Sequence, residues 1–318
     1  MRFLKAILVG LFLAMSTSAV FAQPLVSTQW AHDKLSAENV IFIDLRNKID
    51  GGSYETWLEG HIPGSVHSDY LQAGWRVGRD DVVGLLPSAE DFQALARQLG
   101  VSHDSHVVLV PAGVNSTDFG SAARAYWTFK VFGHDAVSIL DGGYSKWSSE
   151  YSDLIETGAP AAPLAGDFVA LFDSRSYIDS NGVKLAIGND DALLLDARTP
   201  EQFAGKAKHG KALKAGHIPG AVLHPQNLAY DADSNQVKSA VALAEIYKDH
   251  DNSQIISYCN TGHWAATNWF VLSELLGRKD VKLYDGSMVE WTADNANLVG
   301  TESNLDKVKG LFKSIVGG

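Results

Sequence analysis

The sequence predicts an α/β fold made of two similar domains. Three observations carry the α/β prediction: motifs that occur twice, short apolar runs that alternate with helical patterns, and a length that suits two domains. The chain has 318 residues, 46% of them hydrophobic, whereas a single domain typically has about 100–150 residues. Each half can therefore bury its own core around a central parallel sheet flanked by helices.

Four motifs of the first half return in the same order in the second half. They are "IFIDLR" at 41–46 and "LLLDAR" at 193–198, "EGHIPGS" at 59–65 and "AGHIPGA" at 215–221, "HVVLV" at 106–110 and "QIISY" at 254–258, and "ILDGGYSKW" at 139–147 and "LYDGSMVEW" at 283–291. The aspartates of the first pair lie 152 residues apart and those of the last pair 144 apart, a drift that loop insertions explain. Self-similarity of this kind indicates an internal repeat.

Within each half, apolar runs alternate with longer helical patterns. The run "HVVLV" precedes a helix expected over 122–132, and "QIISY" precedes one expected over 265–276. Continuous apolar runs between helices are typical of parallel strands covered on both faces. A last amphipathic helix is expected over 304–316, as a packing element.

The first 22 residues have the layout of a secretory signal peptide. Arg2 and Lys5 precede an apolar run at 6–15, and Val20 and Ala22 stand at the −3 and −1 positions of a cleavage site. The apolar run is shorter than the roughly 20 residues that span a bilayer. We therefore expect export to a periplasm, with no membrane attachment after cleavage.

These patterns divide the chain into four segments. We expect a signal peptide at 1–22, an N-terminal domain at 23–151, a linker rich in Ala, Gly and Pro at 152–167, and a C-terminal domain at 168–318.

The charge balance bears on the partners. The signal segment holds two of the 26 Lys and Arg residues and none of the 37 Asp and Glu residues, so the mature chain has a formal net charge of −13. That sign argues against a nucleic-acid or anionic-membrane partner. We expect the mature protein to be a monomer that acts on small molecules.

Cys259 is the only cysteine of the chain. Exported proteins normally use cysteines in pairs, as disulfides, so a single one is a buried filler, an intermolecular bridge or a reactive thiol. Cys259 follows directly on the expected strand at 254–258 and precedes the expected helix at 265. Loops in that position lie at the carboxyl end of a parallel sheet, where such folds bind ligands. This position favours the reactive thiol.

The loop itself suits a thiolate. Between Cys259 and the helix lie Asn260, Thr261, Gly262, His263 and Trp264. Backbone N–H groups in such a loop can point inward, and the following helix presents its positive end, which stabilises a thiolate. Glycine at the middle position lets the backbone turn with a positive φ.

The paired "D-x-R" elements, the paired "GHIPG" elements and the Cys-headed loop together resemble the tandem-domain rhodaneses, the thiosulfate and 3-mercaptopyruvate sulfurtransferases. The resemblance runs from about residue 26 to residue 291 and implies two rhodanese-like domains, of which only the second is catalytic. The sequence agrees, because Pro111 stands opposite Cys259 when the copies are aligned from the preceding strand, and Asn115 when they are aligned from the helix. Neither residue is a nucleophile.

The resemblance also implies the chemistry. The Cys259 thiolate would take the outer sulfur of an anionic donor such as thiosulfate and pass it, as a persulfide, to cyanide, a thiol or a protein acceptor. The loop amides from Asn260 to Trp264 would hold the thiolate and the persulfide. No metal and no organic cofactor is required. A 3-mercaptopyruvate-type enzyme and a non-catalytic persulfide carrier or binding module remain alternatives.

The loop differs from the family pattern at the positions whose side chains would balance the donor's negative charge. Thiosulfate-preferring members carry Arg and Lys just after the cysteine, where this chain has Asn260 and Thr261, and many members have an Arg where Gln202 stands. Trp264, where a small residue is common, would narrow or cap the pocket. His263 either helps as a cation or faces solvent.

Two other parts of the chain are candidate sources of positive charge. The locally basic segment 205–217 either borders a cleft between the domains or is a solvated surface loop. It contains Lys206, Lys208, Lys211 and Lys214. Arg124, expected near the start of the helix over 122–132, is a further candidate to face the cleft.

Other cysteine enzymes fit the sequence less well. A cysteine phosphatase needs an Arg six residues after the cysteine, and this chain has Ala265 there. A thiol-disulfide oxidoreductase needs a second cysteine two or three residues on, where Thr261 and Gly262 stand. A cysteine protease needs a His and an acid as base and orienter, and no peptide groove is evident.

The remaining motif residues are expected to serve the fold. Asp196 and Arg198 would orient backbone groups under the loop and pair with each other, as supporting residues of the site. Asp44 and Arg46 occupy the same places in the copy that lacks a cysteine, which indicates a structural role. The same argument makes His61 and His217 scaffold residues.

Overall fold

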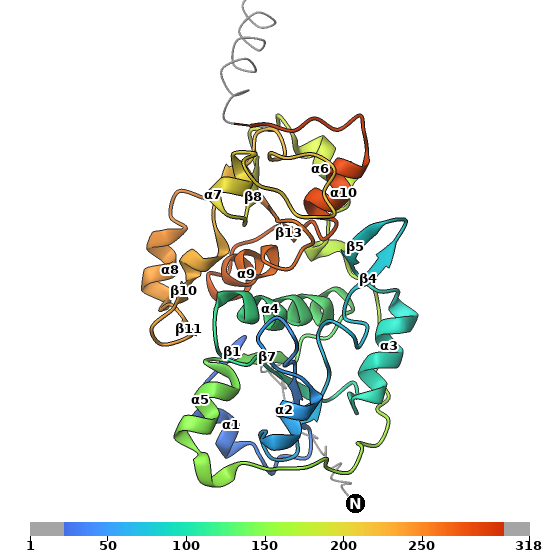
Figure 1. Ribbon diagram of the computed structural model, residues 1–318, viewed down its shortest axis with the longest axis vertical. Coiled ribbons are helices and arrows are strands. Elements are labelled where there is room, and N and C mark those ends of the chain that lie inside the picture. The colour runs from blue at the N-terminus through green and yellow to red at the C-terminus, as the bar shows by residue number, and fades with distance from the viewer. Residues whose placement is uncertain (1–21, 302–318) are drawn as a thin grey trace, which may run out of the picture.

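The computed structural model describes residues 22–301. The expected signal peptide at 1–22 lies outside the described residues except for Ala22, and the expected helix over 304–316 lies outside them entirely. The described chain forms two α/β copies stacked along the long axis of the molecule (Figure 1). Below, the first copy is residues 22–151 and the second copy is residues 168–301.

The first copy is built on a five-stranded sheet in the order β1-β7-β6-β2-β3, in which every pairing is parallel. Its strands are β1 (Leu25–Val26), β2 (Val40–Asp44), β3 (Val66–His67), β6 (His106–Val110) and β7 (Val137–Leu140). Its helices are α1 (Thr28–Asp33), α2 (Tyr54–Glu59), α3 (Ala89–Gln98), α4 (Ser116–Val131) and α5 (Gly143–Glu150), and the short η1 (Ser152–Leu154) follows the first copy.

The second copy repeats this plan with a four-stranded parallel sheet in the order β13-β12-β8-β9. Its strands are β8 (Ala192–Asp196), β9 (Val222–Leu223), β12 (Gln254–Tyr258) and β13 (Val281–Leu283). Its helical segments are η2 (Ser174–Ser176), α6 (Ser180–Ala186), α7 (Pro200–Phe203), η3 (Gln226–Ala229), α8 (Ala240–Ile246), α9 (Ala265–Phe270), the π-helical η4 (Val271–Leu275) and α10 (Ser287–Ala293). The predicted class, two parallel-sheet α/β domains, is confirmed.

Each copy also sends a two-stranded hairpin to the other. The first hairpin is β4 (Val77–Arg79) with β5 (Val82–Leu85), and the second is β10 (Tyr230–Asp231) with β11 (Gln236–Val237). The N–H of Leu86 donates to Asp285 of the second copy at 2.6 Å. The N–H of Val237 donates to Asp141 of the first copy at 3.1 Å. The hairpins thus cross between the copies as a reciprocal pair.

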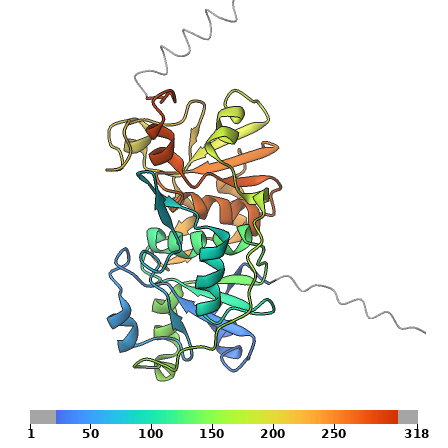
Figure 2. The same ribbon diagram turned by 90° about the vertical axis from the view of Figure 1, so that its right-hand side faces the viewer.

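Helices α4 and α9 lie between the two sheets (Figures 1 and 2). Their aromatic side chains pack across the boundary: Phe270 meets Phe119 with ring centroids 5.8 Å apart and Tyr126 with centroids 4.9 Å apart. One cluster of buried hydrophobic residues runs from the first sheet through both helices to the second sheet. Because this core is continuous, a site between the copies has firm walls.

Helix α4 begins earlier than the sequence pattern predicts. The expected start at residue 122 is wrong, because Asn115 caps the helix by accepting hydrogen bonds from the N–H groups of Thr117 and Asp118 at 2.9 and 3.0 Å. An asparagine cap of this kind satisfies N–H groups that the first turn leaves free. Arg124 therefore lies in the middle of the helix and not near its start.

Residues 155–173 contain no helix or strand, apart from one bridge between Glu156 and His61. They run along the first copy, with the Arg97 guanidinium donating to the carbonyl of Phe168 at 2.7 Å. Phe168 is 2% exposed and joins the common core.

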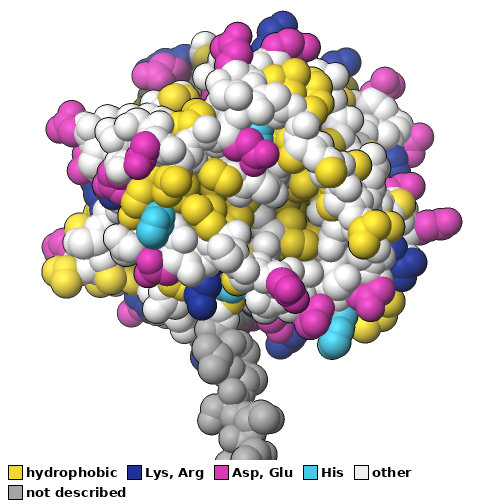
Figure 3. All heavy atoms as spheres, turned by 90° about the horizontal axis from the view of Figure 1, so that it is seen from below, with side chains coloured by type: hydrophobic (Ala, Val, Ile, Leu, Met, Phe, Trp, Pro, Cys, Tyr) yellow, Lys and Arg dark blue, Asp and Glu magenta, His cyan; other side chains and the backbone are white. Residues whose placement is uncertain are grey.

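The face seen from below in Figure 1 carries acidic and basic side chains of mixed sign around a few hydrophobic patches (Figure 3). Among the helices of residues 22–301, none combines the length and the apolar character that crossing a membrane requires.

Candidate active site

Cys259 heads the loop between β12 and α9, as the sequence predicts. It is 2% exposed, and β12 lies between β8 and β13 in the parallel sheet. Gly262 has φ +70°, and a Cβ there would lie 2.2 Å from Nη1 of Arg124 and 2.8 Å from Cα of Asp285. Only glycine fits this position, because both the backbone angle and the space exclude a side chain.

Ser287, which the sequence analysis did not single out, ties this loop together. Its Oγ accepts from the N–H of Cys259 at 3.0 Å and from the N–H of Gly262 at 3.2 Å, and donates to the carbonyl of Tyr284 at 2.7 Å. Ser287 has a positive φ of 49°, an unusual backbone conformation for a residue other than glycine. The repeat offered a signal, since "DGG" at 141–143 aligns with "DGS" at 285–287.

Other amides of the loop have no protein partner. Within residues 22–301, the backbone N–H groups of Asn260, Thr261, His263 and Trp264 donate no hydrogen bond. Unpaired N–H groups beside a cysteine can stabilise an anion that forms there. The amides that Ser287 leaves without a partner are suited to an anionic sulfur species.

Cys259 lines a pocket of about 250 Å³ between the two copies. The first copy contributes Ile49, Arg76 and Thr117, and the second contributes Gln202 and His209 besides the loop. No Asp or Glu of the described chain lines this pocket. Arg76 is its one Lys or Arg side chain among the described residues.

Arg76 was missed by the sequence analysis. It stands directly before β4, in a segment without a repeated motif. Only the crossing of the hairpin to the other copy brings it to the cysteine.

His263 does not supply a cation. Its Nε2 donates to the carbonyl of Thr117 at 2.9 Å, so its Nδ1 accepts from the Tyr70 hydroxyl at 2.9 Å. Burial, followed by the nearby Arg76 charge, lowers the pKa of His263 to about 3. The side chain is 8% exposed. Both interpretations offered by the sequence, a protonated imidazole and a solvent-facing one, are wrong because the ring is buried between the copies.

Asn260 and Trp264 contact other residues of the pocket. Asn260 donates from Nδ2 to Oε1 of Gln202 at 3.3 Å, which closes one side of the pocket. Trp264 lines the pocket and donates from Nε1 to Oγ1 of Thr117 at 3.2 Å. Trp264 therefore forms part of the pocket wall, and its hydrogen bond to Thr117 attaches that wall to the first copy.

Asp196 and Arg198 form a buried ion pair at 2.6 Å, and the Arg198 guanidinium also donates to the carbonyl of Gly216 at 2.8 Å. Arg46 makes the same two contacts in the first copy, with Asp44 at 2.9 Å and with the carbonyl of Gly60 at 2.8 Å. A contact set present in both copies serves the fold, in line with the structural role expected for the pair.

His61 and His217 each contact a backbone carbonyl through Nδ1 at 2.8 Å, those of Trp57 and Phe203 respectively. Each imidazole also stacks on the side chain of that same residue. Neither histidine lines the cysteine pocket.

The basic segment 205–217 contributes no lysine to the pocket walls. Lys208 donates to the carbonyl of Ala212 at 2.6 Å, and Lys214 donates to the carbonyls of Asn295 and Asn297. His209 is the residue of this segment that reaches the pocket.

Arg124 is fully buried beneath the loop. Its guanidinium donates to the carbonyl of Thr261 at 3.4 Å and to that of Gly84 at 3.1 Å, and pairs with Asp285 at 3.4 Å. It faces the boundary between the copies, as expected, but it supports the loop and does not line the pocket.

The first hairpin rests on the loop. Gly84 has φ +87°, and a Cβ there would lie 2.7 Å from Cβ of Thr261. The backbone of one copy therefore touches the loop of the other.

Metal ligands do not gather here. In the part of the chain that the structure describes, no three His, Cys, Asp or Glu side chains are grouped so that they could hold a metal ion.

Comparisons with known proteins identify the family. The family model for the rhodanese-like domain matches residues 27–150 and 181–294. The chain is 34% identical over 298 residues to a Mycolicibacterium smegmatis protein named "Putative thiosulfate sulfurtransferase", with 88% of this chain and 97% of that protein covered. It is 36% identical over 299 residues to the "Sulfur carrier protein TtuD" of Thermus thermophilus, with 88% and 96% covered.

Among solved structures, the fold is similar to that of SseA from Escherichia coli, described as a 3-mercaptopyruvate sulfotransferase. The TM-score is 0.70 at 29% sequence identity, covering 84% of this chain and 99% of SseA.

Proposed function

Since this chain belongs to the rhodanese family in its tandem form, and is a sulfurtransferase of the rhodanese or 3-mercaptopyruvate type, we propose that Cys259 carries the transferred sulfur as a persulfide. The donor is a small anion such as thiosulfate, and the acceptor is cyanide or a thiol. The observation that carries the proposal is the position of Cys259: it lines a pocket between the copies, beside loop amides that have no partner among the described residues.

The first half-reaction loads the enzyme. The Cys259 thiolate attacks the outer sulfur of thiosulfate, a sulfur–sulfur bond forms to the enzyme, and the bond to the sulfonate sulfur breaks. Sulfite leaves with the electron pair, and the negative charge remains on the terminal sulfur of the persulfide. In this proposal the unpartnered amides of Asn260 and Thr261 hold that charge, since such donors act best where charge collects in a water-poor site.

The second half-reaction unloads it. A nucleophilic acceptor attacks the terminal sulfur, and Cys259 leaves as a thiolate, ready for another donor. Attack of a thiolate on a sulfur–sulfur bond follows the rules of thiol–disulfide exchange. A lone cysteine suits this cycle, because a neighbouring thiol would discharge the persulfide as a disulfide.

Donor choice rests on the pocket walls. Asn260 and Thr261 carry no charge, so a doubly charged donor meets its countercharge at Arg76. The similarity to SseA makes 3-mercaptopyruvate the alternative donor. The similarity to the sulfur carrier TtuD makes a persulfide carrier the second alternative.

We further propose that residues 1–22 export the chain to the periplasm and that the mature protein is monomeric there. Intact mass of the protein recovered from the periplasm after expression in a Gram-negative host tests the first point. A mass that still includes residues 1–22 contradicts it.

The experiment that tests the catalytic proposal is intact-mass analysis after mixing the protein with thiosulfate or with 3-mercaptopyruvate. A gain of about 32 Da that maps to Cys259 is the expected result for a persulfide. Its loss on addition of cyanide or a thiol completes the cycle. If neither donor yields the adduct, the proposal fails and a binding role replaces it.

A further inference from the structure

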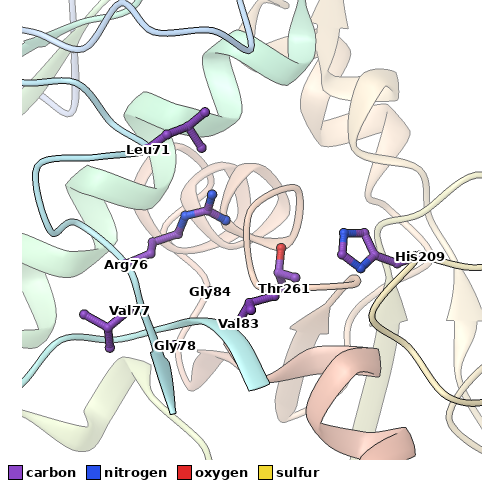
Figure 4. Close-up of a pocket in the computed structure, with 8 residues that line it drawn as sticks. All are labelled: Leu71, Arg76, Val77, Gly78, Val83, Gly84, His209 and Thr261. Carbon is purple, nitrogen blue, oxygen red and sulfur yellow. The ribbon is translucent and has the colours of Figure 1, made fainter. Parts of the chain in front are cut away.

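We propose that a second cavity beside the cysteine pocket binds the carboxylate of an extended organic thiol, which accepts the sulfur from Cys259. This inference rests on the proposed function, and it adds the chemical class of the acceptor. The cavity, called the adjoining cavity below, has a volume of about 280 Å³. Hairpin residues of the first copy, among them Val77 and Val83, form one side, and His209 and Thr261 of the second copy form the other (Figure 4).

The adjoining cavity and the cysteine pocket are neighbours, and the two together are called the groove below. Arg76, His209 and Thr261 line both of them. In this proposal, a molecule that reaches Cys259 with one end places its other end in the adjoining cavity.

Hydrogen-bond donors converge on the shared part of the groove. Figure 4 shows the Arg76 guanidinium and the His209 ring on opposite sides of one space, with Thr261 between them. Nε of Arg76 is buried and has no hydrogen-bond partner in the described chain. The guanidinium lies 4.7 Å from the centroid of the Tyr70 ring, which supports one of its faces.

The histidine adds a neutral donor. Nδ1 of His209 accepts from the N–H of Lys211 at 3.2 Å, so its hydrogen is on Nε2. Burial, then the charges of Arg76, Lys208 and Lys211, lower the pKa of His209. The ring is therefore neutral at pH 7, and Arg76 supplies the positive charge.

No acidic side chain of the described residues lines either cavity. A planar guanidinium matches a carboxylate with two parallel hydrogen bonds. Valine and glycine on the hairpin side suit a short hydrocarbon chain between that carboxylate and the thiol.

The order of the reaction leaves room for such an acceptor. Sulfite departs after loading, so the acceptor enters an emptied groove. Its thiolate attacks the terminal sulfur of the Cys259 persulfide anion, a new sulfur–sulfur bond forms on the acceptor, and the bond to Cys259 breaks. Cys259 leaves as a thiolate with the electron pair of that bond, and the transferred sulfur keeps its negative charge as the persulfide anion of the acceptor.

The test uses the mature protein loaded with thiosulfate and freed of excess donor. Two thiols of equal length and similar thiol reactivity unload it, 6-mercaptohexanoate and 6-mercaptohexanol, and mass spectrometry follows the loss of the sulfur. We expect the carboxylate to unload the protein at least about tenfold faster, the effect of one charge-assisted hydrogen bond. Arg76→Gln should reduce this preference to near unity, and Arg76→Lys should restore part of it.

Lys211→Gln is the matched control, since it removes a nearby exposed charge that lines neither cavity. It should keep the preference. Equal rates for the two thiols in the unmodified protein, or a preference that survives Arg76→Gln, would overturn the inference. Thermal unfolding of each variant identifies one that fails to fold, and Arg76→Lys then decides.

A second arm does not depend on sulfur transfer. Adipate, which has carboxylates but no thiol, should slow alkylation of Cys259 by neutral iodoacetamide in the unmodified protein and not in Arg76→Gln. If loading fails while adipate protects, the proposed function is wrong and the carboxylate site stands. If loading succeeds and adipate protects both proteins equally, the site is wrong and the proposed function stands.

Discussion

The loop after β6 in the first copy and the loop after β12 in the second follow the same backbone route. The carbonyl of Pro111 accepts from the N–H of Tyr144 at 2.9 Å, and the carbonyl of Cys259 accepts from the N–H of Met288 at 3.1 Å. These matched bonds place Pro111, and not Asn115, opposite Cys259. The frame of the loop is therefore shared, and only its contents differ.

What fills the first loop is a carboxylate of the protein itself. Asp118 accepts hydrogen bonds from the N–H groups of Ala112, Gly113 and Val114 at 3.0, 2.6 and 3.2 Å. The corresponding place on α9 is Ala266, which has no carboxylate. The loop shape thus gathers amides around a carboxyl group in the first copy, and the second copy leaves its amides for a substrate.

The residues around the two loops also differ between the copies. Ser287, which ties the second loop, corresponds to Gly143, which has no side chain to accept a bond. Arg76 stands directly before the first hairpin, whereas Ala229 stands directly before the second. The first copy has no nucleophile and no serine tie in its loop, and the hairpin that it receives from the second copy brings no Arg, yet its own hairpin completes the site of the second copy. The comparison teaches that the copy without a nucleophile is still part of the active site.

The largest effect is expected from Cys259→Ser, which removes the thiol that distinguishes the second loop from the first. Sulfur transfer from thiosulfate to cyanide should fall by about three orders of magnitude or more, the usual cost of losing a nucleophile. The midpoint of thermal unfolding should change little, because the substitution is nearly isosteric. If the variant retains sulfur transfer, another residue is the nucleophile and the catalytic role assigned to the second loop is wrong.

The next test makes the second loop resemble the first. Ser287→Ala leaves the buried amides of Cys259 and Gly262 without their acceptor, at a cost of about 1–3 kcal/mol. We expect kcat/KM to fall about tenfold, since roughly 1.4 kcal/mol corresponds to a factor of ten.

Ser287→Gly separates two causes. It also removes the hydroxyl but accommodates the positive φ without strain. If kcat/KM falls equally in both variants, the lost hydrogen bonds are the cause. If it falls in Ser287→Ala but not in Ser287→Gly, backbone strain is the cause. Wild-type rates in both would show that the tie is unnecessary.

A smaller effect is expected where the hairpin touches the loop. Gly84→Ala adds a Cβ at 2.7 Å from that of Thr261, so we expect kcat/KM to fall several-fold as the loop shifts. Gly51→Ala is the matched control, because Gly51 has a similar φ of +81° and open space around it. Both variants should lose about 1–2 kcal/mol of stability through the left-handed backbone. Equal kinetics in the two would show that the hairpin contact does not shape the site.

Much of the fold could be predicted from the sequence, because motifs that occur twice indicate two domains with the same arrangement of strands and loops. The parallel sheets and the position of Cys259 follow from local patterns of apolar and polar residues. Arg76 could not be predicted, since it comes from a segment without a motif and reaches the site only through the crossing hairpin. The burial of His263 is likewise a tertiary effect, produced by Tyr70 and Thr117 of the other copy.

The smallest effect on transfer is expected from Asp118→Asn, which alters the filled loop and leaves the working one intact. Burial, and next the charge of Asp50, raise the pKa of Asp118 to about 7, even though three amides donate to it. An unfolded aspartate has a pKa near its ordinary value of 3.8, so folding favours the protonated form between these two values. The contribution of this group to the free energy of unfolding is therefore complete below about pH 4 and is lost as the pH rises through 7.

Asparagine has no such titration, so the variant should lose less stability than the unmodified protein between pH 4 and pH 8 in urea unfolding. Near pH 5 the variant should be the less stable of the two, by about 1–3 kcal/mol, because its NH₂ group faces an amide donor. Sulfur transfer through Cys259 should stay within about twofold, since Asp118 lies in the other loop. Parallel pH curves would mean that Asp118 is ionised in the fold and acts as a permanent anion in the first loop. A large loss of transfer would mean instead that the two loops are coupled through α4, and the first copy would then do more than supply a wall.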